Sequence, residues 1–470
     1  MSQCSPMGLI TMSLQDCAQA LGAQLLSPNP NIHAVFEGIY TDSRRISAKQ
    51  LFVALRGEHF DGHDYVACVA ERGAVAAVVS RKIAHPIPQL IVGDTMWAYG
   101  QLAQYWRSRF SLPTIGITGS NGKTTVKEML RVILAAHLHD ESAVLATDGN
   151  LNNNIGVPQM MLKLQPHHRM AVFEMGMNHL NEIDYLSRLL VPDVALIIMA
   201  GTAHIGELGS REAIAQAKGE LFLGLPDDGV ACINLDDAFQ NYWRGVVGSA
   251  NRRRIVTFGT NSEAMVRGQL QHDGIQLTIA SESRHIKLAV LGEHNQRNAI
   301  AAAAGAHALG VPLATIAVAL ATFSGIDGRL SRYVGLNDAT VIDDTYNANP
   351  DSMRAAIDVL TAIVGEKILV LGDMGELGKE SEKMHAEIGE YARDANVDAL
   401  FAVGSDAHAY VSACGKRAAH YADVDGLVAA LTPKLHAGVT VLVKGSRFMK
   451  MERVVKKIAP QYGLHNKDTH

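Results

Sequence analysis

The sequence predicts an α/β protein with three domains, and three observations support this prediction. Its 470 residues correspond to three domains at a prior of about 150 residues each. Short, nearly continuous apolar runs alternate with helical patterns, which is typical of strands buried on both faces of a parallel sheet. A glycine-rich turn, TGSNGKTT (118–125), follows one of these runs and precedes a helical pattern.

The composition is that of a globular protein in a reducing compartment. Hydrophobic residues make up 48% and charged residues 19% of the chain, which is too apolar for disorder. The net charge of -5 lacks the basic bias of nucleic-acid-binding domains, so no nucleic-acid partner is predicted. The absence of a C-x-x-C pair argues against a disulfide framework or zinc ribbon; the cysteines are Cys4, Cys17, Cys68, Cys232 and Cys414.

The chain also lacks the sequence patterns of export and membrane insertion. The stretch MSQCSPMGLITMSLQDC (1–17) has neither the basic region nor the long apolar core of a signal peptide. No apolar run approaches the ~20 residues that span a bilayer. The sequence therefore predicts a cytoplasmic protein without a membrane span.

The first predicted domain, residues 1–112, is a small α/β unit. Its apolar strands are separated by turns, and a helical pattern ends it. The strands are LFVAL (51–55), AAVVS (76–80) and QLIVG (89–93), and the helix is WAYGQLAQYWRSRF (97–110).

The second and third predicted domains, residues 113–326 and 327–470, each contain a series of buried strands with helices between them. The second series predicts a largely parallel sheet: TIGIT (114–118), AVLAT (143–147), MAVFEMG (170–176), VALIIMA (194–200) and GVACIN (229–234). The third series predicts a compact Rossmann-like domain: TVIDD (340–344), KILVLGD (367–373), DALFAVG (398–404) and TVLVKGS (440–446).

TGSNGKTT has the features of a phosphate-binding loop. Gly119 and Gly122 permit the turn that directs backbone N–H groups at an anion, Lys123 neutralises terminal phosphates, and the Thr124 hydroxyl ligates Mg²⁺. The strict Walker pattern fails, because Ile117 occupies the position of its first glycine. The alternative is an ordinary Gly-Asn turn with a solvated lysine. The predicted ATP contacts of this loop are Gly119, Ser120, Asn121, Gly122, Lys123, Thr124 and Thr125.

Two further polar residues lie where apolar runs end. Glu174 closes MAVFEMG, and His204 follows VALIIMA. Open α/β sheets bind ligands at the carboxyl ends of their strands, and a carboxylate there can hold Mg²⁺ against phosphates. The alternatives are an acid in solvent and a structural histidine.

Lys218 lies on the apolar stripe of a predicted helix, REAIAQAKGELFLGL (211–225). An unpaired buried ammonium costs several kcal/mol. The side chain must therefore extend to solvent, pair with an anion or change its chemistry.

TGSNGKTT resembles the nucleotide loop of the Mur ligases, the cytoplasmic enzymes that build the peptide of bacterial peptidoglycan, and of the related folylpolyglutamate synthetases. The resemblance extends from TDSRR (41–45) to VKGSR (443–447). It implies a UDP-substrate-binding first domain, a central ATP-binding domain with a P-loop, and a Rossmann-like third domain. It also implies ATP and Mg²⁺ as cofactors.

The resemblance assigns chemical roles to three of these residues. The A-K-G-E segment resembles one whose lysine is carbamylated by CO₂, which makes Lys218 a carboxylate-like support for Mg²⁺. In the same family the ligands of the second metal match Glu174 and His204. Lys123, Lys218 and His204 are therefore the predicted catalytic residues.

The adenine and ribose contacts are also implied by resemblance. LGEHNQRNAIAAAAGAHALG (291–310) predicts an Ala-rich helix that follows Asn295 and Asn298. This segment resembles the Mur ligase H-N-x-x-N stretch, which implies that Asn295 contacts adenine; a capped, packed helix is the alternative. Arg329 and Asp344 are the implied γ-phosphate and ribose contacts, brought over the nucleotide by the third domain.

Within the family, DDTYNANPDSM (343–353) and LGDMGELG (371–378) resemble the members that add D-alanyl-D-alanine to UDP-MurNAc-tripeptide. The implied reaction converts the tripeptide carboxylate into an acyl phosphate, which the dipeptide amine attacks. Asn154 stands where an aspartate is common. The implied substrate contacts are Ser43, Asn153, Tyr346, Asn347 and Asn349.

Two other functions stay open at the level of sequence. A folylpolyglutamate synthetase shares the core but uses another acceptor, and a regulatory ATPase or GTPase hydrolyses nucleotide without ligation. The expected partners are small molecules, and the chain is expected to be a monomer. The C-terminal tail GLHNKDTH (463–470) carries no signal.

Overall fold

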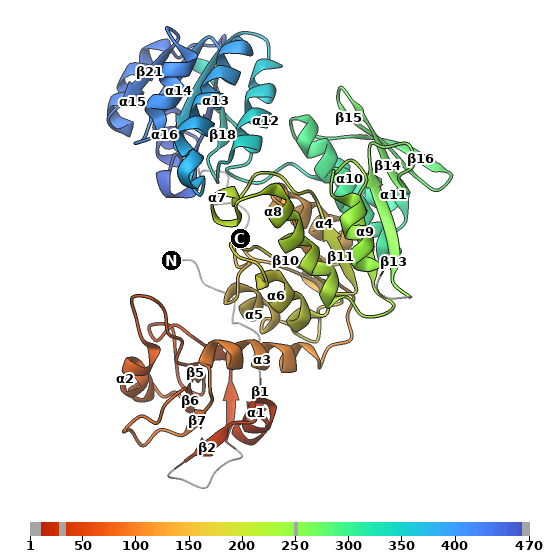
Figure 1. Ribbon diagram of the computed structural model, residues 1–470, viewed down its shortest axis with the longest axis vertical. Coiled ribbons are helices and arrows are strands. Elements are labelled where there is room, and N and C mark those ends of the chain that lie inside the picture. Colours follow the sequence, from red (N-terminus) through yellow and green to blue (C-terminus); the bar gives the residue numbers. More distant parts are fainter. Residues whose placement is uncertain (1–10, 28–33, 249–251, 463–470) are drawn as a thin grey trace.

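Four β-sheets organise the protein, whose structure is a computed structural model that describes residues 11–27, 34–248 and 252–462. Three larger sheets follow one another along the chain and form three bodies (Figure 1). The predicted limits at residues 112 and 326 fall between these sheets, and we propose them as the domain limits. Cys4, the start of the N-terminal stretch and the tail (463–470) lie outside the described residues.

The first domain contains a five-stranded sheet of order β2-β7-β6-β5-β4 and a separate β1–β3 pair. The predicted strands at 51–55, 76–80 and 89–93 are all present, and β4 to β7 are parallel. The strands are β1 (Thr11–Ser13), β2 (Gln24–Leu26), β3 (Val35–Glu37), β4 (Ile39–Tyr40), β5 (Leu51–Val53), β6 (Ala76–Val79) and β7 (Gln89–Ile91); the helices are α1 (Leu14–Leu21), α2 (Val66–Glu71) and α3 (Thr95–Arg107).

The central domain contains a nine-stranded sheet of order β16-β15-β14-β13-β12-β11-β8-β10-β9. The five predicted strands are present and parallel. These strands are β8 (Thr114–Thr118), β9 (Val144–Ala146), β10 (Met170–Glu174), β11 (Val194–Ile197) and β12 (Val230–Asn234), followed by β13 (Arg254–Gly259), β14 (Val266–Gln271), β15 (Gly274–Ile279) and β16 (Glu282–Lys287).

The edge of this sheet departs from the prediction, because β14, β15 and β16 pair antiparallel. Buried residues alternate with less buried ones in β14 and in most of β15, and Ile286 is the one buried residue of β16. No continuous apolar run therefore marks these strands in the sequence. The helices of the central domain are α4 (Lys123–Leu138), α5 (Gly156–Met161), α6 (Glu182–Leu190), α7 (Ile205–Leu208), α8 (Arg211–Gly219), α9 (Gln240–Val247), α10 (Glu293–Ala308) and α11 (Leu313–Thr322).

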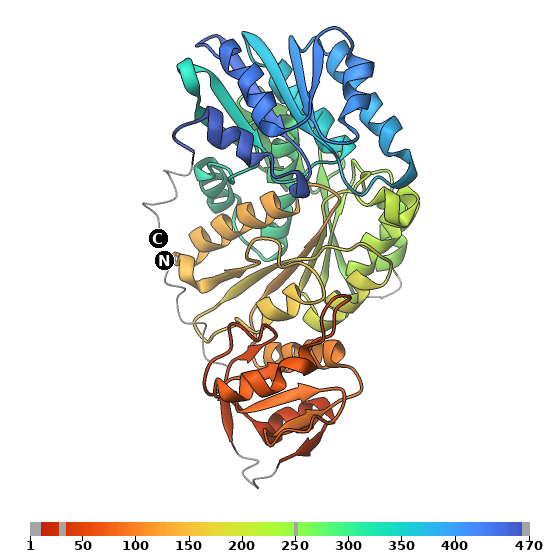
Figure 2. The ribbon, with the colours of Figure 1, turned by 90° about the vertical axis from the view of Figure 1, so that its left-hand side faces the viewer.

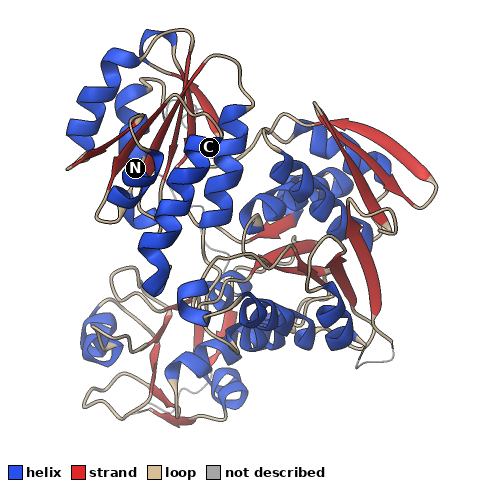
Figure 3. Ribbon diagram, turned by 45° about the horizontal axis from the view of Figure 1, so that its top comes forward, coloured by secondary structure: helices blue, strands red, loops and turns tan. Residues whose placement is uncertain are grey.

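The third domain contains a six-stranded sheet of order β17-β18-β22-β19-β20-β21, parallel except for edge strand β17. Helices cover both faces of it (Figure 3). The strands are β17 (Ser331–Val334), β18 (Thr340–Asp344), β19 (Glu366–Gly372), β20 (Ala399–Val403), β21 (Ala418–Tyr421) and β22 (Val439–Lys444); the helices are α12 (Pro350–Thr361), α13 (Ser381–Asp394), α14 (Ala407–Cys414), α15 (Val424–Leu431) and α16 (Glu452–Ile458). This arrangement confirms the α/β prediction.

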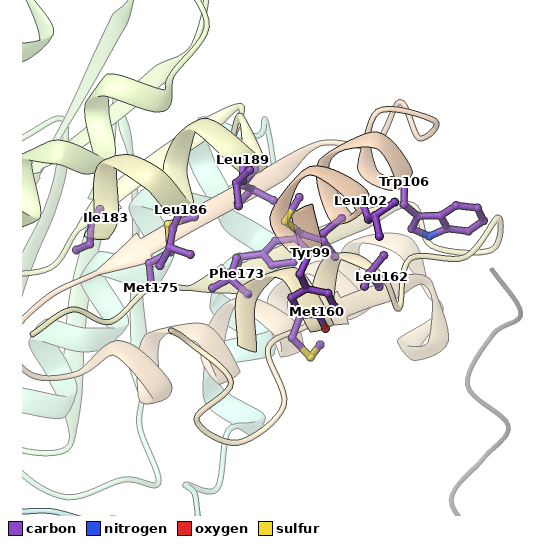
Figure 4. Close-up of a cluster of buried hydrophobic side chains, with 14 of the residues drawn as sticks. Tyr99, Leu102, Trp106, Met160, Leu162, Phe173, Met175, Ile183, Leu186 and Leu189 are labelled. Atoms are coloured by element: carbon purple, nitrogen blue, oxygen red, sulfur yellow. The ribbon is translucent and has the colours of Figure 1, made fainter. Parts of the chain in front are cut away.

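The three domains stack in sequence order, with the central domain between the other two (Figure 2). The first and central domains share one hydrophobic core. Helix α3 contributes Tyr99, Leu102 and Trp106, which face side chains of α5, β10 and α6 (Figure 4). The Trp106 indole N–H also donates to the Leu164 carbonyl at 3.1 Å. This shared core makes the two domains one packed unit.

Two helix predictions are wrong at their boundaries. The predicted helix 211–225 ends as an α-helix at Gly219 and continues as a 3-10 helix over Glu220–Gly224. The Arg253 guanidinium donates to the carbonyls of Phe222 and Leu225, which satisfies the end of this turn from outside. The helix predicted to follow Asn295 and Asn298 begins at Glu293 and contains both asparagines.

Among the described residues, no helix combines the length and the apolar character needed to cross a bilayer.

Candidate active site

A cavity of about 1050 Å³ lies between the central and third domains. The carboxyl ends of β8 and β10 open into it from the central domain, as expected for an α/β sheet. Most of the predicted site residues line it: Ser120, Asn121, Gly122, Lys123, Thr124, Thr125, Asn153, Glu174, His204, Asn295, Arg329, Asp344, Tyr346, Asn347 and Asn349.

The nucleotide loop connects β8 to α4. Gly122 has a φ of 81°, and an added Cβ would lie 2.3 Å from Asn298 Oδ1. Glycine is therefore required both by the backbone conformation and by the close approach of α10. Lys123 is the first residue of α4, and its Nζ donates to the Gly119 carbonyl at 2.8 Å. The loop thus holds its lysine at a helix N-terminus, where anions bind.

Burial lowers the pKa of Lys123, and the nearby Glu174 carboxylate partly offsets this effect. Thr124 Oγ1 donates to Glu174 Oε2 at 2.9 Å, and Asn152 Nδ2 donates to Glu174 Oε1 at 2.8 Å. Glu174 is 2% exposed at the end of β10. A hydroxyl and a carboxylate oxygen therefore meet beside the loop, which is the kind of oxygen pair that Mg²⁺ uses together with phosphates.

Arg329 reaches this same oxygen pair from the start of the third domain. Its Nη2 donates to Thr124 Oγ1 at 2.9 Å. Its guanidinium also lies 4.2 Å from the centre of the Tyr346 ring, which is a cation–π distance. The contact places a third-domain guanidinium at the nucleotide loop.

Lys218 is 1% exposed near the end of α8, so its ammonium does not extend to solvent. Burial, reinforced by the neighbouring Lys123 charge, holds the pKa of Lys218 well below its usual value. Lys218 is not among the described residues that line the cavity. Burial therefore favours the neutral amine over the ammonium, and a neutral amine is a nucleophile.

His204 is paired across the domain interface. Its Nδ1 lies 2.8 Å from Glu376 Oε2, and this contact is the main reason why the pKa of Glu376 is lowered. Both residues have left-handed backbones, with φ of 65° and 62°. Such conformations in non-glycine residues cluster at functional sites.

On the third-domain side, Asp344 forms an ion pair with Lys444. Lys444 Nζ lies 2.5 Å from Asp344 Oδ2 and donates to the Asn347 carbonyl at 2.9 Å. Lys444 is 3% exposed. This lysine therefore fixes both the predicted ribose contact and the turn that follows it.

Several predicted contacts have structural roles in this arrangement. Asn153 Oδ1 accepts from the Gly156 N–H at the start of α5. Asn295 Nδ2 donates to the Leu291 carbonyl. Asn349 caps α12 through the Ser352 N–H. Ser43 lies in the first domain, where the Arg72 guanidinium donates to its carbonyl. It is not among the described residues that line this cavity.

Three residues of the site were not predicted from the sequence: Asn152, Glu376 and Lys444. Glu376 and Lys444 belong to the motifs LGDMGELG and VKGSR quoted above, whereas Asn152 lies in the stretch NLNNNIGVP (150–158). Their partners lie 22 or more residues away, as for Asn152 and Glu174. The only available signal was a polar residue at the end of an apolar run, as at Lys444.

Comparisons with known proteins agree with this geometry. The family description "Mur ligase middle domain" matches residues 117–306, "Mur ligase, glutamate ligase domain" matches 328–447, and "Mur ligase family, catalytic domain" matches 35–98.

Individual proteins match over nearly the whole chain. The UDP-N-acetylmuramoyl-tripeptide–D-alanyl-D-alanine ligase of Escherichia coli (strain K12) is 38% identical over 455 residues, 96% of this chain and 99% of that protein. A crystal structure of MurF from Acinetobacter baumannii has a TM-score of 0.87 at 38% identity, covering 96% and 99%. The MurF ligase from Thermotoga maritima in complex with ADP has a TM-score of 0.78 at 26% identity, covering 89% and 96%. The chain belongs to the Mur ligase family.

Proposed function

We propose that this protein is an ATP-dependent ligase that joins D-alanyl-D-alanine to UDP-N-acetylmuramoyl-tripeptide. The product is the UDP-linked pentapeptide precursor of peptidoglycan, formed with ADP and phosphate. The contact between Arg329 and Thr124 carries the proposal, because it places a guanidinium from the third domain at a nucleotide loop in the central domain. The similarity to the E. coli ligase over 96% of this chain supports the choice of substrates.

The reaction first activates a carboxylate. An oxygen of the tripeptide's terminal carboxylate attacks the γ-phosphorus of ATP, the bond to the β,γ-bridging oxygen breaks, and ADP leaves. Lys123 and Arg329 are suited to stabilise the negative charge on the transferring group. The two anions repel each other, and these cations offset that repulsion within one cavity.

The second step forms the amide bond. The dipeptide amine attacks the acyl phosphate carbonyl, loses a proton and expels phosphate from the tetrahedral intermediate. Water would hydrolyse an exposed acyl phosphate, so a cavity closed by two domains favours ligation. His204 stays a proposed catalytic residue, positioned by Glu376 at 2.8 Å.

The residues present fit a magnesium ion. Thr124 Oγ1 and Glu174 Oε2 are neighbouring oxygen donors, and we propose these two with His204 and a modified Lys218 as the metal-binding set. When bound, Mg²⁺ neutralises charge on the phosphate oxygens. Among the described residues, no group of three His, Cys, Asp or Glu side chains forms a metal site.

We propose that Lys218 is carbamylated. Its neutral amine attacks the carbon of CO₂, forms an N–C bond and releases one proton, which leaves a carboxylate-like anion next to the Lys123 ammonium. Burial is the main reason why the pKa of Lys218 is low, and repulsion by Lys123 adds to it. The carbamate would replace that repulsion by an attraction to the Lys123 ammonium.

The carbamate is tested with ¹³C-bicarbonate and carbon NMR. Wild-type protein should show a carbamate carbonyl signal that Lys218→Met lacks and that Lys383→Met, at an exposed surface lysine, retains. A signal that persists in Lys218→Met, or is absent from the wild type, would contradict the assignment.

We also propose that the ligase acts as a monomer in the cytoplasm. The unpaired cysteines support a reducing compartment: Cys17, Cys68, Cys232 and Cys414 are free. Sedimentation equilibrium should give the mass of one 50.5 kDa chain, and a dimer mass would contradict this part.

The central experiment measures phosphate release from ATP and Mg²⁺ with UDP-MurNAc-tripeptide and D-Ala-D-Ala supplied singly and together. Release should require both, with a UDP-pentapeptide identified by mass. Lys123→Met should lower kcat by at least about 100-fold, whereas Lys383→Met should not. Steady release without the dipeptide would favour a regulatory ATPase, and ligation onto a folate would favour the synthetase alternative.

A further inference from the structure

The first turn of α12 contacts the central domain through Asp351. Its Oδ2 accepts from the Thr202 backbone N–H at 2.7 Å and from Thr202 Oγ1 at 2.8 Å. Thr202 belongs to the loop after β11, two residues before His204. A carboxylate with two hydrogen bonds to one residue is a strong and directional contact.

The neighbouring Gly201 shows how closely the two domains approach. An added Cβ there would lie 2.5 Å from Asp351 Oδ2. The Gly201 N–H donates to Ser120 Oγ, in the nucleotide loop, at 2.9 Å. A hydrogen-bonded path therefore runs from the nucleotide loop through Gly201 and Thr202 to Asp351.

A second contact joins the same helix turn directly to the nucleotide loop. Asn349 Nδ2 donates to Asn121 Oδ1 at 2.8 Å, and Asn121 Nδ2 donates in return at 3.4 Å. Asn349 Oδ1 also accepts the Ser352 N–H as the cap of α12. These contacts occupy the Asn349 side chain, which sequence resemblance implied to be a substrate contact.

Within its own domain, the Asp351 side chain makes one weak contact with a charged group. The charged group nearest to its Oδ1 is Arg354, on the same helix at 3.9 Å, which is a weak, partly exposed pair. The carboxylate therefore acts mainly between the domains. The third domain that it holds also contributes Asp344 and Tyr346 to the cavity.

We propose that Asp351 is a positioning residue that orients the third domain on the loop after β11. It sets the orientation in which Arg329 meets Thr124, and so it determines how often the cavity is assembled for reaction. The docking of the third domain through Asp351 is inferred from the geometry alone. Its effect on the reaction rate rests on the proposed ligase function.

The docking is tested by hydrogen–deuterium exchange and mass spectrometry on the full chain without substrates. The Thr202 backbone N–H donates to Asp351 in the wild type. In Asp351→Ala, the amide hydrogens of a peptide containing Thr202 should therefore exchange at least about tenfold faster than in the wild type. The matched control is Asp358→Ala on the same helix, whose carboxylate accepts from Tyr391 within the third domain. Equal exchange at Thr202 in wild type and Asp351→Ala would overturn the proposal.

The kinetic consequence is tested by the split between kcat and KM. Asp351→Ala should lower kcat for ligation about 10- to 100-fold and change KM for the UDP-tripeptide less than about threefold. Asp351→Asn, which keeps one acceptor, should recover part of kcat, and Thr202→Val should add little to Asp351→Ala. A kcat for Asp351→Ala within twofold of wild type would overturn the positioning role. A wild type that makes no UDP-pentapeptide would refute the proposed function instead, and the exchange result would still decide the docking.

Discussion

Buried charge distinguishes the individual residues of this site. Glu174 and Lys218 have almost no exposed surface. Burial also lowers the pKa of both Lys123 and Lys218. An isolated buried charge is costly, so each must be compensated by another group. The Glu174 carboxylate favours the charged form of Lys123. Lys218 instead has the positively charged Lys123 as its charged neighbour, which disfavours its ammonium form. That difference makes Lys218 the residue at which a chemical modification is most useful.

Asp343 supports a prediction about pH. The residue is fully buried in β18, and its Oδ1 accepts from Thr345 Oγ1 at 2.6 Å. Burial raises the pKa of Asp343, so between pH 3.8 and this raised value the folded chain binds more protons than the unfolded chain. The free energy of unfolding therefore falls as pH rises through this window.

Asp343→Asn keeps the acceptor and removes the charge. It should raise the free energy of unfolding at pH 7, and the gain should disappear below about pH 3.8, where the unfolded carboxyl is also protonated. Urea unfolding at pH 7 and pH 3.5 measures both values. A gain of equal size at the two pH values would contradict this explanation.

At the scale of elements, two adjacent strands are joined at their carboxyl ends by one ion pair. Asp344 ends β18, Lys444 ends β22, and the two residues are directly paired in the parallel register. Lys444 also donates to the Asn347 carbonyl in the turn before α12. The pair therefore links strand pairing to the position of the helix that contacts the central domain.

Lys444→Met should leave the half-buried Asp344 carboxylate without its partner. We expect the free energy of unfolding to fall by about 3 kcal/mol and KM for ATP to rise. Adding Asp344→Asn should restore part of the stability but not the KM. Lys434→Met, at an exposed lysine, is the control, and a Lys444→Met protein as stable as this control would show that the pair is energetically neutral.

At the scale of the whole molecule, the domains are joined by two different kinds of interface. The first and central domains share a hydrophobic core, whereas the third domain has its own cores on the two faces of its sheet. The contacts between the third and central domains described above are hydrogen bonds and one contact between the His204 imidazole and the Glu376 carboxylate. Polar interfaces of this kind permit relative domain motion.

The three tryptophans allow this difference to be measured. Trp97, Trp106 and Trp243 all lie in the first two domains. Tryptophan fluorescence should therefore follow unfolding of residues up to 326, while far-UV circular dichroism follows the entire chain. The two thermal midpoints should differ, and ATP with Mg²⁺ should bring them together because a ligand that contacts both parts stabilises both. Superimposable curves without ligand would contradict independent unfolding of the third domain.

Much of the fold and part of the site were predictable because their causes are local. The strand, loop and helix around Gly119–Thr124 are contiguous, and the run MAVFEMG brings Glu174 to the end of β10. The helix boundaries near Gly219 and Glu293 were wrong, because they depend on contacts from outside the helix, such as the Arg253 guanidinium. The antiparallel strands β14–β16 were missed, because the alternation in β14 and β15 and the exposure of β16 leave no apolar run.

The sequence by itself determined the α/β class, the order of the strands along the chain and the nucleotide loop, since strand burial and loop geometry follow from neighbouring residues. Only the tertiary structure decided that Asp351 meets Thr202, 149 residues away, and that His204 meets Glu376. Such pairs depend on how three folded domains are oriented. Orientation is set by close packing at Gly201 and by polar contacts across the interface, and neither leaves a periodic pattern in the chain.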